Sequence, residues 1–169
     1  TNSDFDCSHI GTPQVVIARM TDESGNDNTC FIFVDVKDEA APTASCVATF
    51  TAQLDANGDA TISTADIDDG SSDNCGVPTL ALDITSFTCA DIGVNTVVLT
   101  VTDATGNTST CTSDVTIEDV TPPTAVECFS TVDVILDANG MGSVPTSVFN
   151  PTDNCSATPD IVVTFDTFQ

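Results

Sequence analysis

The sequence predicts an all-β protein made of tandem, disulfide-stapled β-sandwich domains, and three observations lead to this prediction. Apolar and polar residues alternate in short runs between turn residues, and no helix-length run has apolar residues at helical spacing. Residues 97–119 have the pattern of a complete β-hairpin, and residues 16–38 repeat that pattern. The eight cysteines recur about 80 residues apart, so one repeat spans roughly 80 residues.

The hairpin of residues 97–119 is the best-defined element. Val97, Leu99 and Val101 occupy every second position, the segment DATGN interrupts the pattern, and alternation resumes after it. The copy at residues 16–38 keeps the same Thr-Asp, the same Gly-Asn and a cysteine four residues beyond that Asn. Each copy therefore encodes two strands and a turn.

The repeat divides the chain into three parts. Residues 1–38 carry the second half of a repeat, residues 39–119 a complete repeat, and residues 120–169 the first half of the next. Both junctions contain proline, which fixes φ, so we expect stiff joints rather than flexible tethers. Because the sequence starts and stops in mid-repeat, we expect it to be a window on a longer array.

The complete repeat has the pattern of several short strands. In its first strand every second residue is apolar, so these residues share one face, and the Asn-Gly turn that follows is a strong hairpin signal. The expected elements are a strand over 46–54, a turn over 55–59, a strand over 60–64, an acidic loop over 65–75, a strand over 80–84 with Ile84 facing inward, and the hairpin.

Charge and cysteine content limit the classes of function. The formal net charge is −24, from 26 acidic and 2 basic residues, so the chain lacks the Lys and Arg that nucleic acids or anionic membranes require. We therefore expect no nucleic-acid partner and no direct membrane insertion. Eight regularly spaced cysteines with no CxxC pair and a single histidine indicate disulfides rather than zinc ligands. Disulfides indicate an extracellular or cell-surface location.

Several motifs together resemble a known family. They are PTASC at residues 42–46, Asp73-Asn74, Phe87, Gly93 and TDATGNTSTC at residues 102–111. They look like the hyalin-repeat (HYR) type of immunoglobulin-like domain. With the additional Cys75 and Cys89, the repeat is similar to the tandem repeats of very large Bacteroidetes surface adhesins, including gliding-motility adhesins. The resemblance covers the whole chain and implies tandem Ig-like sandwiches.

The resemblance also implies a disulfide pairing. In the family pattern the cysteine after the first proline pairs with the one in the last strand, which corresponds to Cys46 with Cys111 and leaves Cys75 with Cys89. The residues alone allow three connectivities for these four cysteines. The partners of the remaining cysteines are then expected outside the chain. These cysteines are Cys7, Cys30, Cys128 and Cys155.

One candidate cation site follows the spacing of a calcium loop. Oxygen-bearing side chains occupy positions 1, 3, 5, 7, 9 and 12, which is the spacing that wraps ligands around one hard cation. An ordinary Asn-Gly turn between two strands explains the same residues and is favoured, because Ala60 replaces the usual glycine and no helix flanks the loop. The residues are Asp55, Asn57, Asp59, Thr61, Ser63 and Asp66.

A second candidate cation site lies at the proline-containing joints. Carboxylates gathered there would share calcium and fix the angle between domains, whereas tight turns prefer the same residue types for backbone reasons. The residues are Asp103, Asn107, Glu118 and Asp119, and in the preceding copy Asp22, Asn26, Asp38 and Glu39. No cofactor is expected to be required, with calcium as the one candidate.

The sequence does not favour an enzyme. His9 is the only histidine, and Asp91 takes its place in the complete repeat, so a catalytic triad would belong to one copy alone. The expected function is a stiff, extended stalk of an extracellular adhesin or surface filament, whose partners are neighbouring repeats. Two alternatives remain. One is a module that binds surface glycans or calcium, and the other is a filament subunit assembled head to tail through Cys128–Cys30 and Cys155–Cys7 bridges.

Overall fold

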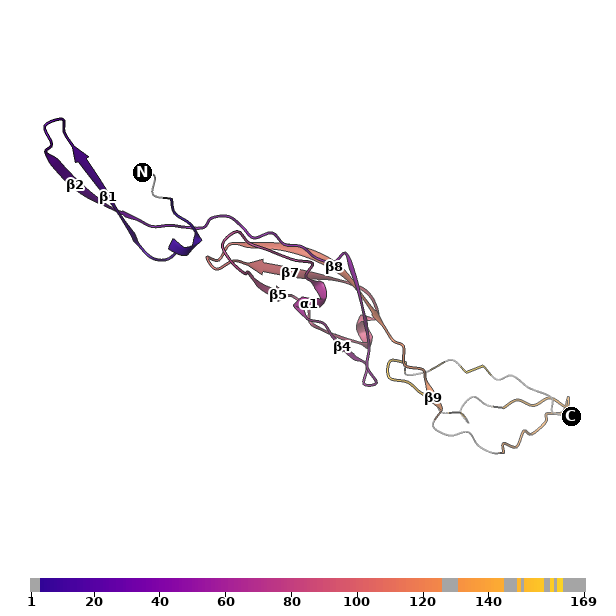
Figure 1. The fold of residues 1–169 in the computed structure, drawn as a ribbon. Helices are drawn as coiled ribbons and strands as arrows, with labels where there is room; N and C mark the ends of the chain where they lie inside the picture. The colour runs from indigo at the N-terminus through magenta and orange to yellow at the C-terminus, as the bar shows by residue number, and fades with distance from the viewer. Residues whose placement is uncertain are drawn as a thin grey trace. The chain divides into compact units, whose positions relative to one another are not determined.

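The computed structural model is mostly β, and its described residues include three disulfide bonds (Figure 1). It describes residues 4–125, 131–144, 149, 151–156, 159 and 161–162. None of the helices in these residues is long and apolar enough to span a membrane. The chain divides into two compact units that each draw on separated segments, so each unit is described by itself.

The first unit comprises Thr1–Ala48, Ser63–Ile84 and Thr96–Ser113. It begins with the short 3-10 helix η1 (Cys7–His9), followed by the antiparallel pair β1 (Gln14–Thr21) and β2 (Asp27–Val34). One helical turn, α1 (Thr64–Ile67), precedes β5 (Thr79–Leu82). Strand β5 pairs antiparallel with residues 99–102 of β7 (Gly93–Thr102).

The second unit comprises Thr49–Ile62, Thr85–Asn95 and Asp114–Gln169. In it β3 (Thr49–Gln53) pairs in parallel with residues 114–118 of β8 (Thr108–Glu118). Two antiparallel pairs accompany it, β4 (Asp59–Thr61) with β6 (Ser86–Thr88), and β9 (Thr124–Ala125) with β10 (Pro151–Thr152). The 3-10 helix η2 (Cys89–Asp91) follows β6.

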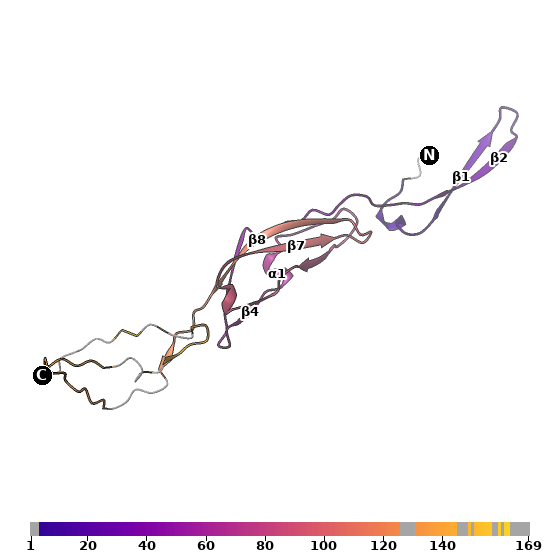
Figure 2. The ribbon, with the colours of Figure 1, turned by 180° about the vertical axis from the view of Figure 1, so that it is seen from behind.

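Strands β3, β8, β7 and β5 form one mixed sheet in that order. Strands β7 and β8 run side by side in both ribbon views (Figures 1 and 2). The predicted hairpin is confirmed, and so is its earlier copy, because β1 and β2 pair across all eight of their residues. Alternation decides which side chains are buried, since Val97, Leu99 and Val101 are all fully buried on β7.

Other buried apolar residues complete the core of each unit. The first unit adds Ile67 from α1, and the second unit contributes residues on or next to β3, β4, β6 and β8. The predicted phase of the first strand is confirmed, because exposure alternates along β3 and ends at the buried Leu54. The buried residues of the second unit are Leu54, Ala60, Ile62, Phe87, Val115 and Ile117.

Two local expectations are wrong. The acidic stretch expected as a loop contains α1, because Asp66 accepts hydrogen bonds from both the N–H and the hydroxyl of Ser63 and so closes a capping box. This turn buries Ile67 completely. Ile84 does not face inward, since β5 ends at Leu82 and the Ile84 side chain is 38% exposed.

Candidate functional site

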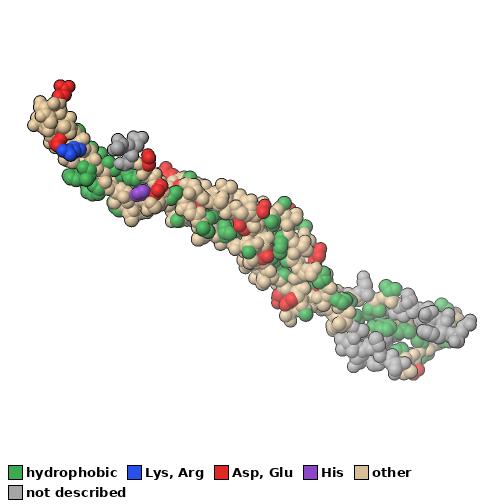
Figure 3. Space-filling model, in the orientation of Figure 1, with side chains coloured by type: hydrophobic (Ala, Val, Ile, Leu, Met, Phe, Trp, Pro, Cys, Tyr) green, Lys and Arg blue, Asp and Glu red, His purple; other side chains and the backbone are tan. Residues whose placement is uncertain are grey.

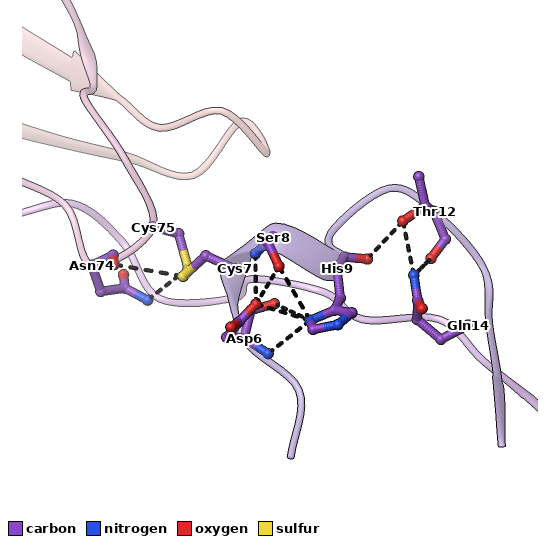
Figure 4. A network of polar contacts seen from close by, with 8 residues as sticks. All are labelled: Asp6, Cys7, Ser8, His9, Thr12, Gln14, Asn74 and Cys75. Carbon is purple, nitrogen blue, oxygen red and sulfur yellow. Dashed lines mark hydrogen bonds and ion pairs between the residues drawn. A yellow bond between two sulfur atoms is a disulfide. The ribbon is translucent and has the colours of Figure 1, made fainter. Parts of the chain in front are cut away.

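The disulfide between Cys7 and Cys75 links the segment before β1 to the loop before β5 (Figure 4). Cys7 opens η1, which Asp6 caps by accepting hydrogen bonds from the N–H and the hydroxyl of Ser8. His9 completes this capping box, because its Nδ1 accepts from the N–H of Asp6 at 3.1 Å. The only histidine therefore has a structural role in the first turn of the described chain.

Three side chains of the β7–β8 hairpin, two from its turn and one from β8, hold the segment that follows β2. The Asn107 amide donates to the backbone carbonyl oxygens of Asp38, at 3.0 Å, and Ala40, at 3.3 Å. The Thr105 hydroxyl donates to the same Asp38 carbonyl at 3.1 Å, and the Ser109 hydroxyl donates to the Pro42 carbonyl at 2.6 Å. Four hydrogen bonds thus fix this proline-containing joint to the hairpin.

Three carboxylates meet at this joint. Among the described residues, Asp38, Asp73 and Asp103 form the one group of three or more metal-ligating side chains, with ligand atoms all within 4.8 Å of one another. Asp103 is only 7% exposed. Asp38 Oδ2 and Asp73 Oδ1 are buried and accept no hydrogen bond from any residue that the structure describes. Buried carboxylate oxygens of this kind are expensive unless a cation compensates them.

Hydrogen bonds orient the carboxylate of Asp103. Its Oδ1 accepts from the N–H groups of Thr105, Gly106 and Asn107, and its Oδ2 accepts from the Asn107 amide at 2.7 Å. Burial raises the pKa of Asp103, but the bonds from Asn107, Thr105 and Gly106 outweigh it and hold the pKa below the ordinary value. Asp103 is therefore fixed in its charged form by the turn itself.

A similar set of contacts surrounds a disulfide in the second unit. Cys89 bonds to Cys155, and Gly58 approaches this disulfide so closely that a Cβ there would lie 2.5 Å from the Cys89 sulfur. Gly58 also has φ of +83°, which side chains rarely tolerate. The Asn154 amide donates to the Asp55 carbonyl at 3.1 Å and to Asp119 Oδ1 at 3.3 Å.

The disulfide pattern confirms one expected pairing and corrects another. Cys46 bonds to Cys111, as the family resemblance implied. The pairing of Cys75 with Cys89 is wrong, because each bonds to a cysteine of an adjoining part of the chain. The expectation that Cys7 and Cys155 find partners outside the chain is therefore wrong as well. Cys30 is exposed and free, and Cys128 lies outside the described residues.

The residues of the calcium-loop pattern serve other local roles. Asp55 closes its own turn, since its Oδ1 accepts from the N–H groups of Asn57 and Asp59. The Asn57 amide donates to Asp55 Oδ2, and Asp66 bonds to Ser63 in the cap of α1. No three carboxylates of this pattern belong to a metal-ligating group among the described residues. The geometry here is that of an Asn-Gly turn.

The residues of the predicted joint site are brought together only in part. Asp103 and Asn107 meet Asp38 from the other predicted set, whereas Asp22 and Asn26 bond to each other within the β1–β2 turn. Asp119 bonds to Asn154 and to the N–H of Thr121. Sequence reasoning missed Asp73 as a site residue. The DNC motif at residues 73–75, which recurs at 153–155, was the available signal.

The Asp55 turn makes stability depend on pH. Hydrogen bonds from the N–H groups of Asp59 and Asn57 hold the pKa of Asp55 below its ordinary value of 3.8. The charged carboxylate therefore favours folding above about pH 4, and this contribution is lost as pH falls through the lower folded-state pKa. We expect Asp55→Asn to lower the melting temperature at pH 7 and pH 5, with the difference from the wild type shrinking below about pH 4.

Asp59→Asn is the matched control for this titration, because the Asp59 carboxylate lies at the same turn but accepts none of these bonds. Melting by circular dichroism from pH 7 to pH 2.5 checks the prediction. A difference between wild type and Asp55→Asn that stays constant down to the lowest pH would contradict it.

Comparisons with known proteins identify no relative. No protein-family model matches the sequence, and no curated protein or solved structure is significantly similar to it. The function must therefore be inferred from the residues and the geometry of the chain.

Proposed function

We propose that this chain is a segment of an extracellular adhesin or surface filament, in which tandem Ig-like domains form a stiff and extended stalk. Three disulfide bonds support an oxidising compartment outside the cytoplasm. The mixed sheet, the separate β4–β6 pair and the Cys46–Cys111 bond support domains of the HYR type. Gliding-motility adhesins are the proposed relatives.

One observation carries the proposal, namely that two disulfides link successive parts of the sequence repeat in the same way. Cys7–Cys75 joins the 1–38 part to the 39–119 part, and Cys89–Cys155 joins the 39–119 part to the 120–169 part. Cys7 and Cys89 occupy equivalent repeat positions, as do Cys75 and Cys155, and the sequence separations within the bonds are 68 and 66. A bond of this kind at each joint would turn a string of domains into a cross-linked rod.

The charge distribution agrees with such a rod. Figure 3 shows acidic side chains scattered over the face in view, where basic side chains are visible at one place. Arg19 and Lys37 already pair with Asp27 and Asp35, respectively. A strongly negative surface keeps neighbouring filaments soluble and apart.

Force spectroscopy on the full chain, held at its two ends, tests the stalk. With the disulfides intact, the covalent path from Cys7 to Cys155 runs through residues 75–89 alone, so unfolding releases only about 14 residues, or on the order of 50 Å. After reduction about 150 residues lie on the path, so we expect an extension on the order of 500 Å.

Cysteine variants identify which disulfide limits the extension. Cys89→Ser/Cys155→Ser is expected to lengthen the released segment several-fold, because it opens the second cross-link. Cys46→Ser/Cys111→Ser is the matched control, since that bond lies off the shortest path and its loss leaves the oxidised extension near 50 Å. Equal extensions for the oxidised and reduced wild type would refute the stalk.

A second candidate function is supported by the β1–β2 hairpin. It exposes large apolar side chains and the free Cys30, whereas the equivalent strands β7 and β8 bury theirs. Complementary half-repeats of separate chains would cover such a surface, as in a self-assembling subunit. The exposed residues are Val15, Ile17, Met20, Phe31, Ile32 and Phe33.

The Cys155–Cys7 bridge expected for this assembly is wrong, because both cysteines bond elsewhere. A bridge from Cys30 stays a prediction. If the subunit assembles, non-reducing gels show covalent multimers that Cys30→Ser abolishes, whereas a monomer alone at high protein concentration excludes this candidate.

A further inference from the structure

We propose that Asp38, Asp73 and Asp103 bind one calcium ion at the joint between residues 1–38 and the following repeat. Their ligand atoms lie within 4.8 Å of one another. Oxygens that bind one calcium at roughly 2.3–2.6 Å are separated by at most about 5 Å. The three carboxylates are therefore spaced to share one ion.

Unsatisfied oxygens supply an observation independent of the clustering. Asp38 Oδ2 and Asp73 Oδ1 are both inaccessible to solvent, and within the described part of the chain neither accepts a hydrogen bond. Their other oxygens are occupied, because Asp38 Oδ1 accepts from the N–H of Ala40 and Asp73 Oδ2 accepts from the N–H of Cys75. Each residue thus keeps one oxygen fixed by the backbone and one without any partner.

No basic side chain compensates this charge. The sequence has only 2 Lys and Arg residues. Arg19 pairs with Asp27, Lys37 pairs with Asp35 at 3.8 Å, and both basic side chains are 69% exposed. Three carboxylates this close repel one another strongly in a partly buried site, so a bound cation is the compensation that the local chemistry allows.

The ligand set selects calcium among common metal ions. All three ligands are oxygens, which suit hard cations. Zinc favours cysteine sulfur and histidine nitrogen, and the cysteine that closely follows Asp73 in sequence and the only histidine of the chain are already engaged in other bonds. Cys75 is oxidised and His9 is engaged in a helix cap. Magnesium demands near-ideal octahedral geometry and keeps its water, so a partly buried cluster of carboxylates fits calcium better.

The hydrogen bonds around Asp103 would orient a ligand. Asn107 donates to Asp103 Oδ2 and at the same time to the carbonyl oxygens of Asp38 and Ala40. Such supporting contacts hold ligands in the geometry that a metal requires. The repeat preserves part of the set, because Asp119, at the end of the 39–119 part, and Asp153, in the 120–169 part, take the positions of Asp38 and Asp73.

An ion here would join three segments, namely the proline-containing joint, the loop next to the Cys7–Cys75 bond and the β7–β8 turn. Calcium binding itself does not depend on the proposed stalk. Its consequence, a joint that stiffens when calcium is present, rests on the proposed function.

The test uses the full chain, stripped of metal by chelator and then titrated with calcium. We expect a dissociation constant of roughly 10⁻⁴ to 10⁻³ M, as in extracellular calcium modules. At about 10 mM calcium the melting temperature should rise on the order of 5 °C, with a smaller rise for magnesium at the same concentration.

Two substitutions identify the ligands without disturbing the backbone. Asp38→Asn and Asp73→Asn each keep an oxygen for the N–H of Ala40 or Cys75 but remove one negative charge. We expect each to weaken calcium binding at least tenfold and to abolish the calcium-dependent shift in melting temperature. In chelator each should melt at or above the wild-type temperature, since a repulsive charge is gone.

Asp59→Asn is the matched control, because it removes one exposed carboxylate outside the group. It should respond to calcium like the wild type. The proposal is overturned if Asp38→Asn and Asp73→Asn respond to calcium as the wild type does. It is also overturned if these two variants melt at a lower temperature than the wild type in chelator. The force experiment on the disulfides is independent of either result, so the stalk and the calcium site fail separately.

Discussion

Replacing Cys46 and Cys111 together by serine is expected to lower the free energy of unfolding by roughly 4 kcal/mol. Their bond closes a sequence separation of 65 residues, and removing it returns the conformational freedom of that loop to the unfolded chain. For a domain of this size, such a loss is a large fraction of the total stability. Urea unfolding without reductant measures it.

Cys30→Ser provides a matched control for this variant. Cys30 occupies the position in the earlier hairpin that Cys111 occupies in the later one, but it is exposed and forms no disulfide. We expect its replacement to change the free energy of unfolding by less than about 0.5 kcal/mol. Equal destabilisation by the single and the double variant would contradict the assignment of stability to the Cys46–Cys111 bond.

The second large effect is expected from the core. Ile117 on β8 is 1% exposed and lies opposite Ala52 of β3 in the parallel ladder. Ile117→Ala should lower the free energy of unfolding by about 2–5 kcal/mol, because it removes buried methylene groups and leaves a cavity. The same urea titration detects it.

Ile17→Ala makes the identical chemical change on β1, where the side chain is 60% exposed. We expect it to cost less than about 1 kcal/mol, since the deleted atoms are already largely in water. If both variants lost the same stability, the placement of Ile117 in the core would be wrong.

Local patterns predicted the parts of the fold that depend on neighbouring residues. The alternation of Val97, Leu99 and Val101 identifies the buried face of β7 because side chains in a strand change sides at every residue. The turn α1 escaped prediction although Ser63 and Asp66 carry its capping signal, since four residues are too few for helical periodicity to appear.

Long-range pairing could not be predicted in the same way. A bond between Cys75 and Cys89 within one repeat and a bond between Cys7 and Cys75 across a joint both satisfy the same periodicity. The choice depends on which segments meet at the joint, and a repeat spacing does not encode this. Asp73 was missed for the same reason, because its role depends on contact with Asp38 and Asp103.

The three disulfides also bear on the fate of a cleaved chain. The bonded intervals 7–75, 46–111 and 89–155 overlap, so at least one of them encloses every peptide bond between Cys7 and Cys155. A protease that cuts one such bond leaves both fragments covalently attached. A protein displayed outside the cell among secreted proteases would thus tolerate single cleavages anywhere in this interval without shedding what lies beyond them.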